Sequence, residues 1–340
     1  MVSKLLLPMD EEYLGNDKPV NKITPVVSVS VTTYNHEAFI GQCLDGILMQ
    51  KTSFPYEVIV GEDDSTDKTR DICKKYAEQY PDKIRLFLRN KKDKILVNGR
   101  HTGKTNSVKN YTAARGNYIA ICDGDDYWTD PSKLEKQVNF LESHPEYVLT
   151  FHNARIVDEN DHFLSEGGVP DKLKKEGRGI DIIAGKWLPT LTVVFRNGSF
   201  EIPKEYFEVL NGDAFLYTLL GHFGGAKYIE EISPAHYRKH SGGIWSALTP
   251  KERYEERINT RIKVLNVVDK KYRWVIRQLL FEDSLYLTSC TGGLFPKVKQ
   301  YFSAYRYFIF RPSFLSKYLE VHGAILRKLF NIKRFSGEGY

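Results

Sequence analysis

The chain has 340 residues, of which 41% are hydrophobic and 27% are charged, and its formal net charge is +6. This composition is ordinary for a globular protein and excludes a disordered or fibrous chain. The length suffices for one large domain with an appendage or for two modest domains. The four cysteines lack metal-ligand spacing, and no apolar run predicts a signal peptide or a membrane span. We therefore expect a cytoplasmic protein with reduced thiols and no structural zinc.

Short apolar stretches alternate with helical periods through the first half of the chain. After a polar leader, buried strands are predicted at 26–32, 56–60, 84–88 and 118–122, and helices at about 37–49, 64–79 and 108–114. Strands that alternate with helices at this spacing pair in parallel through right-handed crossovers. The sequence therefore predicts an α/β fold, with a central, mostly parallel sheet flanked by helices on both faces.

The second half of the chain predicts a change of architecture. A helix at 131–143 and strands at 147–156 and 191–195 continue the α/β pattern, with a surface excursion at 158–185. From about residue 250 the pattern changes to long helical periods with clustered basic and aromatic residues. We expect a leader at 1–25, a nucleotide-binding catalytic domain at 26–248 and a helical C-terminal region at 249–340.

Polar residues follow three of the predicted strands, at 33–35, 62–65 and 123–126. In parallel sheets ligands bind at the carboxyl ends of strands, so these segments should meet at one ligand. Three carboxylates within 123–126 repel one another, and Mg²⁺ commonly binds through one or two carboxylates plus substrate phosphates. A metal-bridged diphosphate is the ligand that this pattern favours. The alternative is a polar turn that only caps the following helix.

Three segments together resemble glycosyltransferase family 2 in their order and spacing: 27–35, 57–67 and 114–128. The resemblance covers about 26–243 and implies the GT-A fold, a Rossmann-like nucleotide-binding domain. It also implies an inverting glycosyltransferase that uses Mn²⁺ or Mg²⁺. Such an enzyme moves a sugar from a nucleoside diphosphate, which we expect to be UDP, to a saccharide or lipid-linked acceptor. Surface polysaccharide biosynthesis is the typical setting of the family.

The resemblance also implies roles for residues around the nucleotide. Thr33, Tyr34 and Glu37 would border the base and the ribose. Asp63 would accept a hydrogen bond from the base, and a carboxylate can accept one from the N–H of uracil or thymine.

Further roles follow at the diphosphate. Asp123 would contact the ribose or the metal, and Asp125 would be the principal metal ligand. The arginine that many members carry before the fourth strand is missing, with Ser107 near its place. Lys104 or Lys109 is then expected to bring positive charge to the diphosphate.

The later part of the chain supplies the remaining candidates. Asp213, at the start of an apolar helix, resembles the family's catalytic acid position, and we expect it to be the general base; a plain helix cap is the alternative. His240 is expected to bind the metal or touch the diphosphate, although a lone histidine is more often structural. Trp128 and Trp245 are candidate sugar-facing aromatics, and either could instead belong to the core.

Other functions and partners stay open. A catalytically inactive nucleotide-sugar binding protein is one alternative. A nucleotidyltransferase is another, but 33–37 is not the glycine-rich cationic loop that it needs, and 99–105 is one residue short of a P-loop. Basic and aromatic residues alternate in the last fifty residues, which is typical of a peripheral membrane helix or of a tail packed on its own domain. The acidic predicted cleft disfavours nucleic acid.

Overall fold

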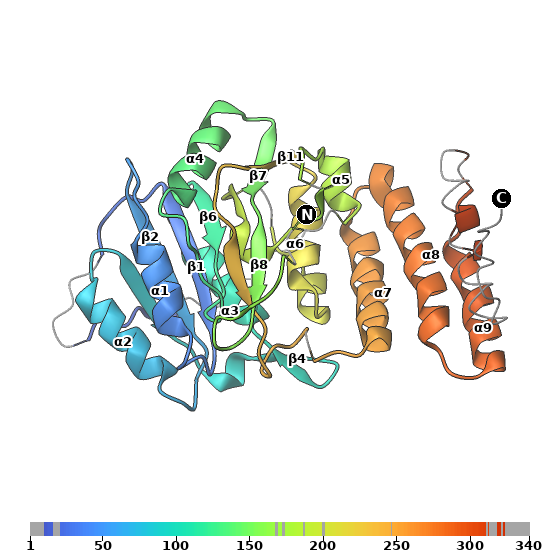
Figure 1. Cartoon of the computed structure of the whole chain (residues 1–340), viewed down its shortest axis with the longest axis horizontal. Helices are drawn as coiled ribbons and strands as arrows, with labels where there is room; N and C mark the ends of the chain where they lie inside the picture. The colour runs from blue at the N-terminus through green and yellow to red at the C-terminus, as the bar shows by residue number, and fades with distance from the viewer. Residues whose placement is uncertain are drawn as a thin grey trace, which may run out of the picture. The chain divides into compact units, whose positions relative to one another are not determined.

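The computed structural model describes residues 10–15, 21–166, 169–171, 174–185, 188–198, 201–245, 247–310, 312, 318–320 and 322–323. The chain divides into two compact units, one made of Met1–Glu208 with Gly212–Ser241 and the other of Val209–Asn211 with Gly242–Tyr340. The first unit holds the sheets, and the second holds the helices α7, α8 and α9 (Figure 1).

A seven-stranded sheet in the order β11-β7-β10-β6-β1-β2-β3 forms the centre of the first unit. All its neighbouring strands are parallel except the pairs that β10 makes with β6 and with β7. The sheet is therefore mixed but mostly parallel, as predicted. Its strands are β1 (Val27–Thr33), β2 (Tyr56–Glu62), β3 (Ile84–Leu88), β6 (Tyr118–Ile121), β7 (Tyr147–Phe151), β10 (Val194–Arg196) and β11 (Gly225–Tyr228).

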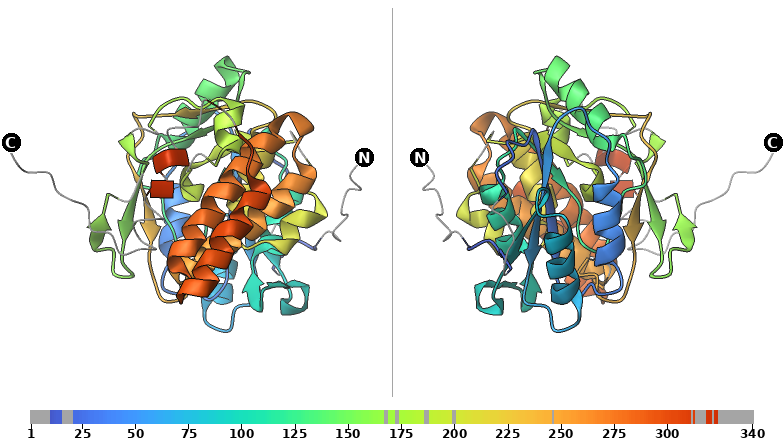
Figure 2. Two further views of the ribbon diagram at one scale, coloured as in Figure 1. Left: turned by 90° about the vertical axis from the view of Figure 1, so that its right-hand side faces the viewer. Right: turned by 90° about the vertical axis from the view of Figure 1, so that its left-hand side faces the viewer.

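Helices cover both faces of this sheet (Figure 2). Side chains alternate between the two faces along a strand. Val58 and Val60 of β2 therefore pack with Cys73 of α2 in the main core, whereas Ile59 clusters on the opposite face with Ala113 of α3. This arrangement confirms the predicted fold class. The helices of the unit are α1 (Ile40–Leu48), α2 (Thr69–Gln79), α3 (Lys104–Ala113), α4 (Lys133–Ser143), α5 (Gly179–Ile183) and α6 (Gly212–Leu220).

Two smaller sheets differ from the sequence prediction. The apolar run 147–156 was predicted as one strand but is two, because β8 (Ala154–Val157) leaves the main sheet to pair with β9 (Phe163–Ser165) and β12 (Ala235–Arg238). Hydrophobic alternation cannot reveal this change of partner, since both strands have buried residues. The second sheet is a hairpin of β4 (Ile95–Val97) and β5 (Arg100–Thr102), whose turn has positive φ at Asn98 and Gly99.

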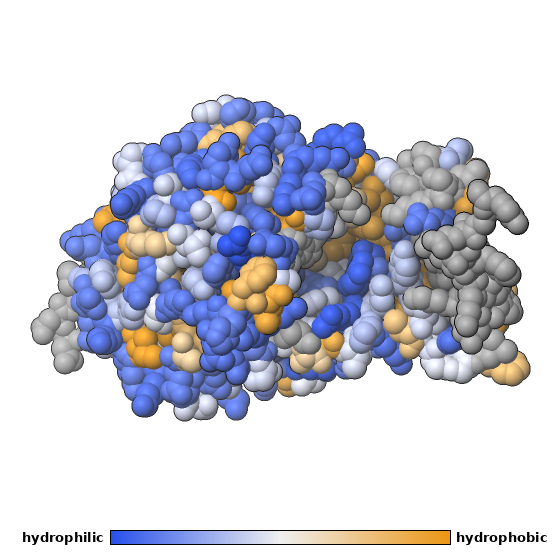
Figure 3. All heavy atoms as spheres, viewed as in Figure 1, coloured by the Kyte–Doolittle hydropathy of each residue, from blue (hydrophilic) through white to orange (hydrophobic). Residues whose placement is uncertain are grey.

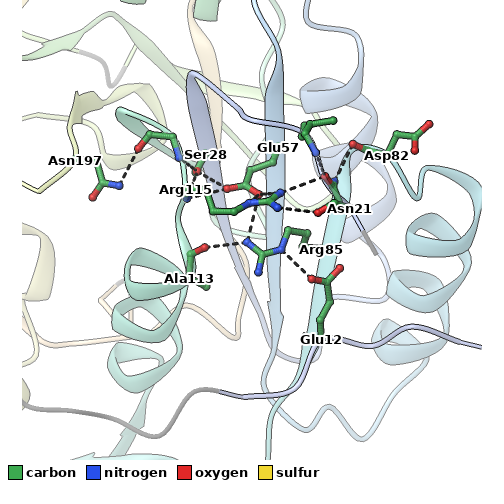
Figure 4. Close-up of polar contacts among 11 residues, drawn as sticks. Glu12, Asn21, Ser28, Glu57, Asp82, Arg85, Ala113, Arg115 and Asn197 are labelled. Carbon is green, nitrogen blue, oxygen red and sulfur yellow. Dashed lines mark hydrogen bonds and ion pairs between the residues drawn. The ribbon is translucent and has the colours of Figure 1, made fainter. Parts of the chain in front are cut away.

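A buried polar network fixes the register of the central strands (Figure 4). Glu57 of β2 is fully buried, and its carboxylate accepts hydrogen bonds from Ser28 of β1 at 2.6 Å and from Arg115 Nε at 2.8 Å. Arg85 of β3 donates to the same carboxylate at 3.3 Å. Removing one partner of such a buried pair costs about 3–5 kcal/mol. The network therefore holds β1, β2, β3 and the entry to β6 in the alignment that brings their carboxyl ends together.

The second unit is a set of helices: α7 (Pro250–Val267), α8 (Arg273–Cys290) and α9 (Leu294–Ala304). Thr249 and Glu252 form a capping box at the start of α7. Asp283 of α8 is buried and pairs with Arg257 and Arg261 of α7, which ties the two helices together. Among the described residues, no helix is both long and apolar enough to cross a membrane.

The surface of the first unit in the view of Figure 3 is mostly hydrophilic, with hydrophobic side chains in small separate spots. Most of its large apolar side chains lie in the core instead. We therefore expect a functional site among the polar side chains at the edge of the main sheet.

Candidate active site

The carboxyl ends of β1, β2 and β6 meet at one edge of the sheet, as the sequence predicted. β1 lies between β2 and β6 and is parallel to both. The backbone N–H of Asp63 donates to the carbonyl of Thr33 at 3.0 Å, and the hydroxyl of Thr32 donates to the carboxylate of Asp123 at 2.6 Å. Neighbouring strands lie about 4.8 Å apart, so the ends of β2 and β6 are separated by about 10 Å. One nucleotide can bridge this distance.

The end of β2 carries a buried ion pair that the sequence analysis missed. Nζ of Lys94 lies 3.7 Å from Oδ2 of Asp63 and 3.1 Å from the centre of the Tyr34 ring. The two charged side chains are only 4% and 9% exposed, respectively. Burial raises the pKa of Asp63 and lowers the pKa of Lys94. The charge of each residue opposes this shift, because it stabilises the ionised form of the other. Lys94 lies between the 3₁₀ turn Lys91–Asp93 and β4, and no local motif marks it.

The loop after β1 is held by reciprocal contacts with the start of α2. The carboxylate of Glu37 accepts from the backbone N–H of Lys68 at 2.9 Å, and the carboxylate of Asp67 accepts from the N–H of Glu37 at 3.1 Å. Asn35 adopts a left-handed conformation with φ of 54°. Glu37 thus stabilises the loop that presents Tyr34, and its predicted contact with the nucleotide stays a prediction.

The acidic turn after β6 gathers two histidines. Oδ2 of Asp125 lies 3.0 Å from Nε2 of His240 and 3.9 Å from Nε2 of His36. One potential ligand atom of each residue lies within 4.8 Å of the other two. Asp126 is buried instead and accepts a hydrogen bond from the backbone N–H of Arg238 at 2.9 Å. Of the predicted metal ligands, Asp125 and His240 are therefore brought together, and His36 joins them.

Gly124 is required at the centre of this turn. A Cβ atom there would lie 2.7 Å from Oγ1 of Thr33 and 3.1 Å from Nδ1 of His36. The same Thr33 hydroxyl lies 3.3 Å from Nδ1 of His36, which orients the ring so that its Nε2 faces Asp125. The absent side chain therefore lets the loop after β1 pack directly on the acidic turn.

The carboxylates of the turn strongly influence one another. Burial raises the pKa of Asp123 to about 6, and the negative charges of Asp125 and Asp213 add to this effect. Burial would also raise the pKa of Asp125, but the hydrogen bond with His240 and the charge of His36 outweigh it and lower that pKa. Asp125 is thus the carboxylate that stays ionised most readily, as a metal ligand must.

Asp213 lies in the first turn of α6 with an exposed side chain. Its carboxylate accepts hydrogen bonds from the backbone N–H of Ala214 at 2.8 Å and from the hydroxyl of Thr190 at 3.3 Å. Because α6 begins at Gly212, Asp213 follows the N-cap position, and its bond to Ala214 is a local contact within the first turn. The negative charge of Asp213 raises the pKa of Asp123, so the two carboxylates influence each other electrostatically.

The two predicted lysines have different surroundings. Nζ of Lys104 lies 5.1 Å from the centre of the Tyr206 ring, and a Cβ on Gly212 would lie 2.9 Å from this nitrogen. Lys104 therefore sits beside the start of α6. The ammonium of Lys109 instead pairs with Asp10 at 2.7 Å and with Asp93 at 3.1 Å.

Trp128 is a core residue, which is one of the two alternatives that the sequence left open for it. Its side chain is only 2% exposed, and its Nε1 donates to the carbonyl of Leu191 at 2.7 Å. The ammonium of Lys133 lies 4.2 Å from its ring centre. Trp245 belongs to the second unit.

Solved structures share this fold. The structure of S. aureus TarS 1-349 in complex with UDP-GlcNAc matches with a TM-score of 0.56 and 19% identity, over 89% of this chain and 81% of that chain. The mannosyltransferase PcManGT from Pyrobaculum calidifontis, in complex with GDP-Man and Mn²⁺, matches with a TM-score of 0.53 and 18% identity, over 93% and 90% of the two chains. The fold is the GT-A fold.

Sequence comparison gives the family. Residues 28–183 match the model of Glycosyl transferase family 2. The uncharacterized protein Rv1520 of Mycobacterium tuberculosis is 36% identical over 235 residues, which cover 68% of this chain and 63% of that relative. The chain thus spans less than two thirds of this relative's length. Residues 28–183 therefore form a glycosyltransferase family 2 domain.

Proposed function

We propose that this protein is an inverting glycosyltransferase that moves a sugar from a nucleoside diphosphate to an acceptor hydroxyl. The observation that carries the proposal is the cluster of His36, Asp125 and His240 at the carboxyl edge of a GT-A sheet. Its three ligand atoms are close enough to share one cation. Asp63, on the neighbouring strand end, supplies a second anchor for the same nucleotide.

The cluster fits a divalent cation, with Asp125 as its principal ligand and His240 and His36 beside it. A bound cation would supply Lewis-acid stabilisation of the negative charge on the departing diphosphate. Mg²⁺ is a hard cation that prefers oxygen ligands, so two imidazole nitrogens favour Mn²⁺. The complex of PcManGT, which shares the fold, contains Mn²⁺.

For the donor we propose a UDP-sugar. Tyr34 offers its ring to the base, and Asp63 offers a carboxylate that can accept from the imide N–H of uracil. Thr33 and Glu37 hold the loop on which Tyr34 lies. Burial of Asp63 makes this contact selective, because a base without a matching N–H would leave a buried carboxylate unpaired.

For the diphosphate we favour Lys104 over Lys109 as the nearby cation. Lys109 already makes two ion pairs on the other side of α3, with Asp10 and Asp93. Lys104 lies beside Gly212, next to Asp213. Asp123 would bind the ribose, with Thr32 holding its carboxylate in place.

Asp213 would act as the general base. It would take the proton of the acceptor hydroxyl while that oxygen attacks the anomeric carbon of the sugar. The bond between this carbon and the diphosphate oxygen breaks as the new bond forms on the opposite face. Nucleoside diphosphate leaves, and the configuration at the anomeric carbon is inverted. The exposed position of Asp213 in the first turn of α6 supports this role, because an incoming acceptor can reach it.

We further propose that the acceptor is a saccharide, free or lipid-linked, of a surface polysaccharide, and that the protein works in the cytoplasm. A lipid-linked acceptor would bring it to the inner face of the membrane. The glycosyltransferase family 2 domain at 28–183 supports the saccharide.

The test is UDP release from a panel of UDP-, GDP- and dTDP-sugars with Mn²⁺, using the complete chain. We expect release from one UDP-sugar, and its loss in Asp125→Ala. Asp213→Asn should lower turnover by about 10²- to 10⁴-fold while the donor still binds. Asp71→Asn, an exposed carboxylate on α2, is the matched control. Binding without release would indicate an inactive nucleotide-sugar binding protein, and release of pyrophosphate would indicate a nucleotidyltransferase.

A further inference from the structure

Helix α9 in the second unit packs on α8 through one face. Tyr301 and Ala304 join a small core with Phe281 and Leu285 of α8. The side chain of Gln300 donates to the carbonyl of Ser284 at 3.3 Å. These contacts fix which way the helix faces.

The opposite face of α9 exposes large apolar side chains to solvent. Phe295, Val298 and Phe302 are 87%, 40% and 66% exposed. Their spacing of i, i+3 and i+7 puts them on one side of the helix, and we call them the α9 stripe. A helix on the surface of a globular protein normally turns polar residues outward. The α9 stripe instead exposes apolar side chains to solvent. Exposed apolar patches of this kind typically mark a site of interaction with a protein or a membrane.

The segment that contains the α9 stripe is basic, and Glu320 follows directly after it. Residues 284–319 contain five lysines and arginines and no aspartate or glutamate. Lys299 is exposed and lies one helical turn after Phe295. Arg306 is exposed in the 3₁₀ turn that follows α9, where its guanidinium carbon lies 4.7 Å from the centre of the Tyr307 ring. Phe295 therefore has a cation one turn away on the same side of α9, and a second cation follows the end of the helix.

We propose that α9 docks on the surface of an anionic lipid bilayer. The α9 stripe would enter the boundary between headgroups and acyl chains, while Lys299 and Arg306 would pair with lipid phosphates. A second copy of the chain fits this surface poorly. Two stripes in contact would bring cations together, with no acidic residue in 284–319 to separate them. The surface needs no sugar donor or metal, so it can be tested separately from catalysis.

The experiment is sedimentation of the full chain with vesicles, without donor or metal. We expect binding to phosphatidylcholine vesicles that contain phosphatidylglycerol to exceed binding to pure phosphatidylcholine vesicles by about tenfold or more, and to weaken with added salt. Phe295→Ser combined with Phe302→Ser should reduce binding by about tenfold or more. Lys299→Glu combined with Arg306→Glu should abolish the preference for anionic vesicles. The double variant Lys299→Glu, Arg306→Glu changes only exposed side chains. It therefore still tests the proposal if the double phenylalanine variant fails to fold.

The matched control is Phe163→Ser combined with Leu164→Ser, on β9 of the first unit. These side chains are 57% and 52% exposed, but they lie outside the α9 stripe. The control should bind anionic vesicles as the unchanged protein does. An equal loss in the control, no preference for anionic lipid, or a stripe-dependent dimer in the absence of vesicles would each overturn the proposal.

Discussion

The ammonium nitrogen of Lys94 lies 3.1 Å from the centre of the Tyr34 ring and 3.7 Å from a carboxylate oxygen of Asp63. It therefore occupies the place between ring and carboxylate where the base of the proposed donor would bind. If the base binds there, this lysine must leave first, so we expect the Lys94–Asp63 pair to compete with the nucleotide.

Replacing Lys94 by methionine should therefore tighten UDP binding. The ion pair is buried, so breaking it costs more than the roughly 1 kcal/mol of an exposed pair, and its loss should lower the Kd by about tenfold or more. Isothermal titration calorimetry measures the change. Lys92→Met, which alters an exposed neighbour in the same turn, should leave the Kd unchanged. Weaker binding by Lys94→Met would mean that this lysine contacts the bound nucleotide instead of blocking it.

Gly124→Ala should damage the metal site more than the fold. The added methyl group must displace Thr33 and His36, because its Cβ would approach them to 2.7 Å and 3.1 Å. We expect the affinity for Mn²⁺ to fall by about tenfold or more, since orienting contacts of metal ligands typically contribute that much. Gly103→Ala is the control, because a Cβ there meets no atom within 4 Å. Equal Mn²⁺ affinity in both variants would remove the link between this glycine and the site.

His36→Ala tests whether the cluster has three ligands or two. If His36 joins Asp125 and His240 at the cation, its removal should weaken Mn²⁺ binding by about 10- to 100-fold, as His240→Ala should. The paramagnetic resonance signal of free Mn²⁺ measures this without substrate. His162→Ala changes an exposed histidine on the same unit and serves as control. Unchanged affinity in His36→Ala would leave only Asp125 and His240 as protein ligands.

Lys133 should make the stability of the protein depend on pH. Its side chain is fully buried, and burial lowers its pKa to about 7 in the folded state from 10.5. Between these values the unfolded chain binds more protons than the folded chain, so the free energy of unfolding rises with pH. The slope is at most about 1.4 kcal/mol per pH unit. Below pH 7 the lysine is charged in both states and contributes no slope.

Lys133→Met should flatten this rise. Urea unfolding at pH 7, 8 and 9 measures it, as the difference between the unchanged protein and the variant. The hydrogen bond from Lys133 to Gln137 at 2.6 Å is lost at every pH, so it does not alter the slope. Parallel stability curves for the two proteins would show that Lys133 titrates normally.

Much of the fold and part of the site could be predicted from residues close together in sequence. The apolar runs of β1, β2 and β6 predict buried strands, and the acidic turn after β6 predicts a cation because nearby carboxylates repel. Parallel pairing then brings Asp63 and Asp123 to one edge of the sheet. The resemblance to glycosyltransferase family 2 predicted a nucleotide-binding domain with its site at the same sheet edge. The match of residues 28–183 to the family model agrees with the resemblance.

Other features could not be predicted because they depend on which distant segments pack together. Lys94 looks like any lysine of a basic loop until the fold buries it against Asp63. His36 becomes a candidate ligand only because Gly124 lets its loop approach Asp125. Trp128 could have faced a sugar or the core, and packing against Leu191 decided for the core.

The sequence by itself determined the strands, the helical periods and the acidic strand ends, since these follow from local backbone preference and from the repulsion between neighbouring charges. Only the tertiary structure decided which side chains meet across the loops and which face of α9 stays open. Burial and contact are properties of the packed chain, because they depend on residues far apart in sequence whose joint positions no local pattern encodes.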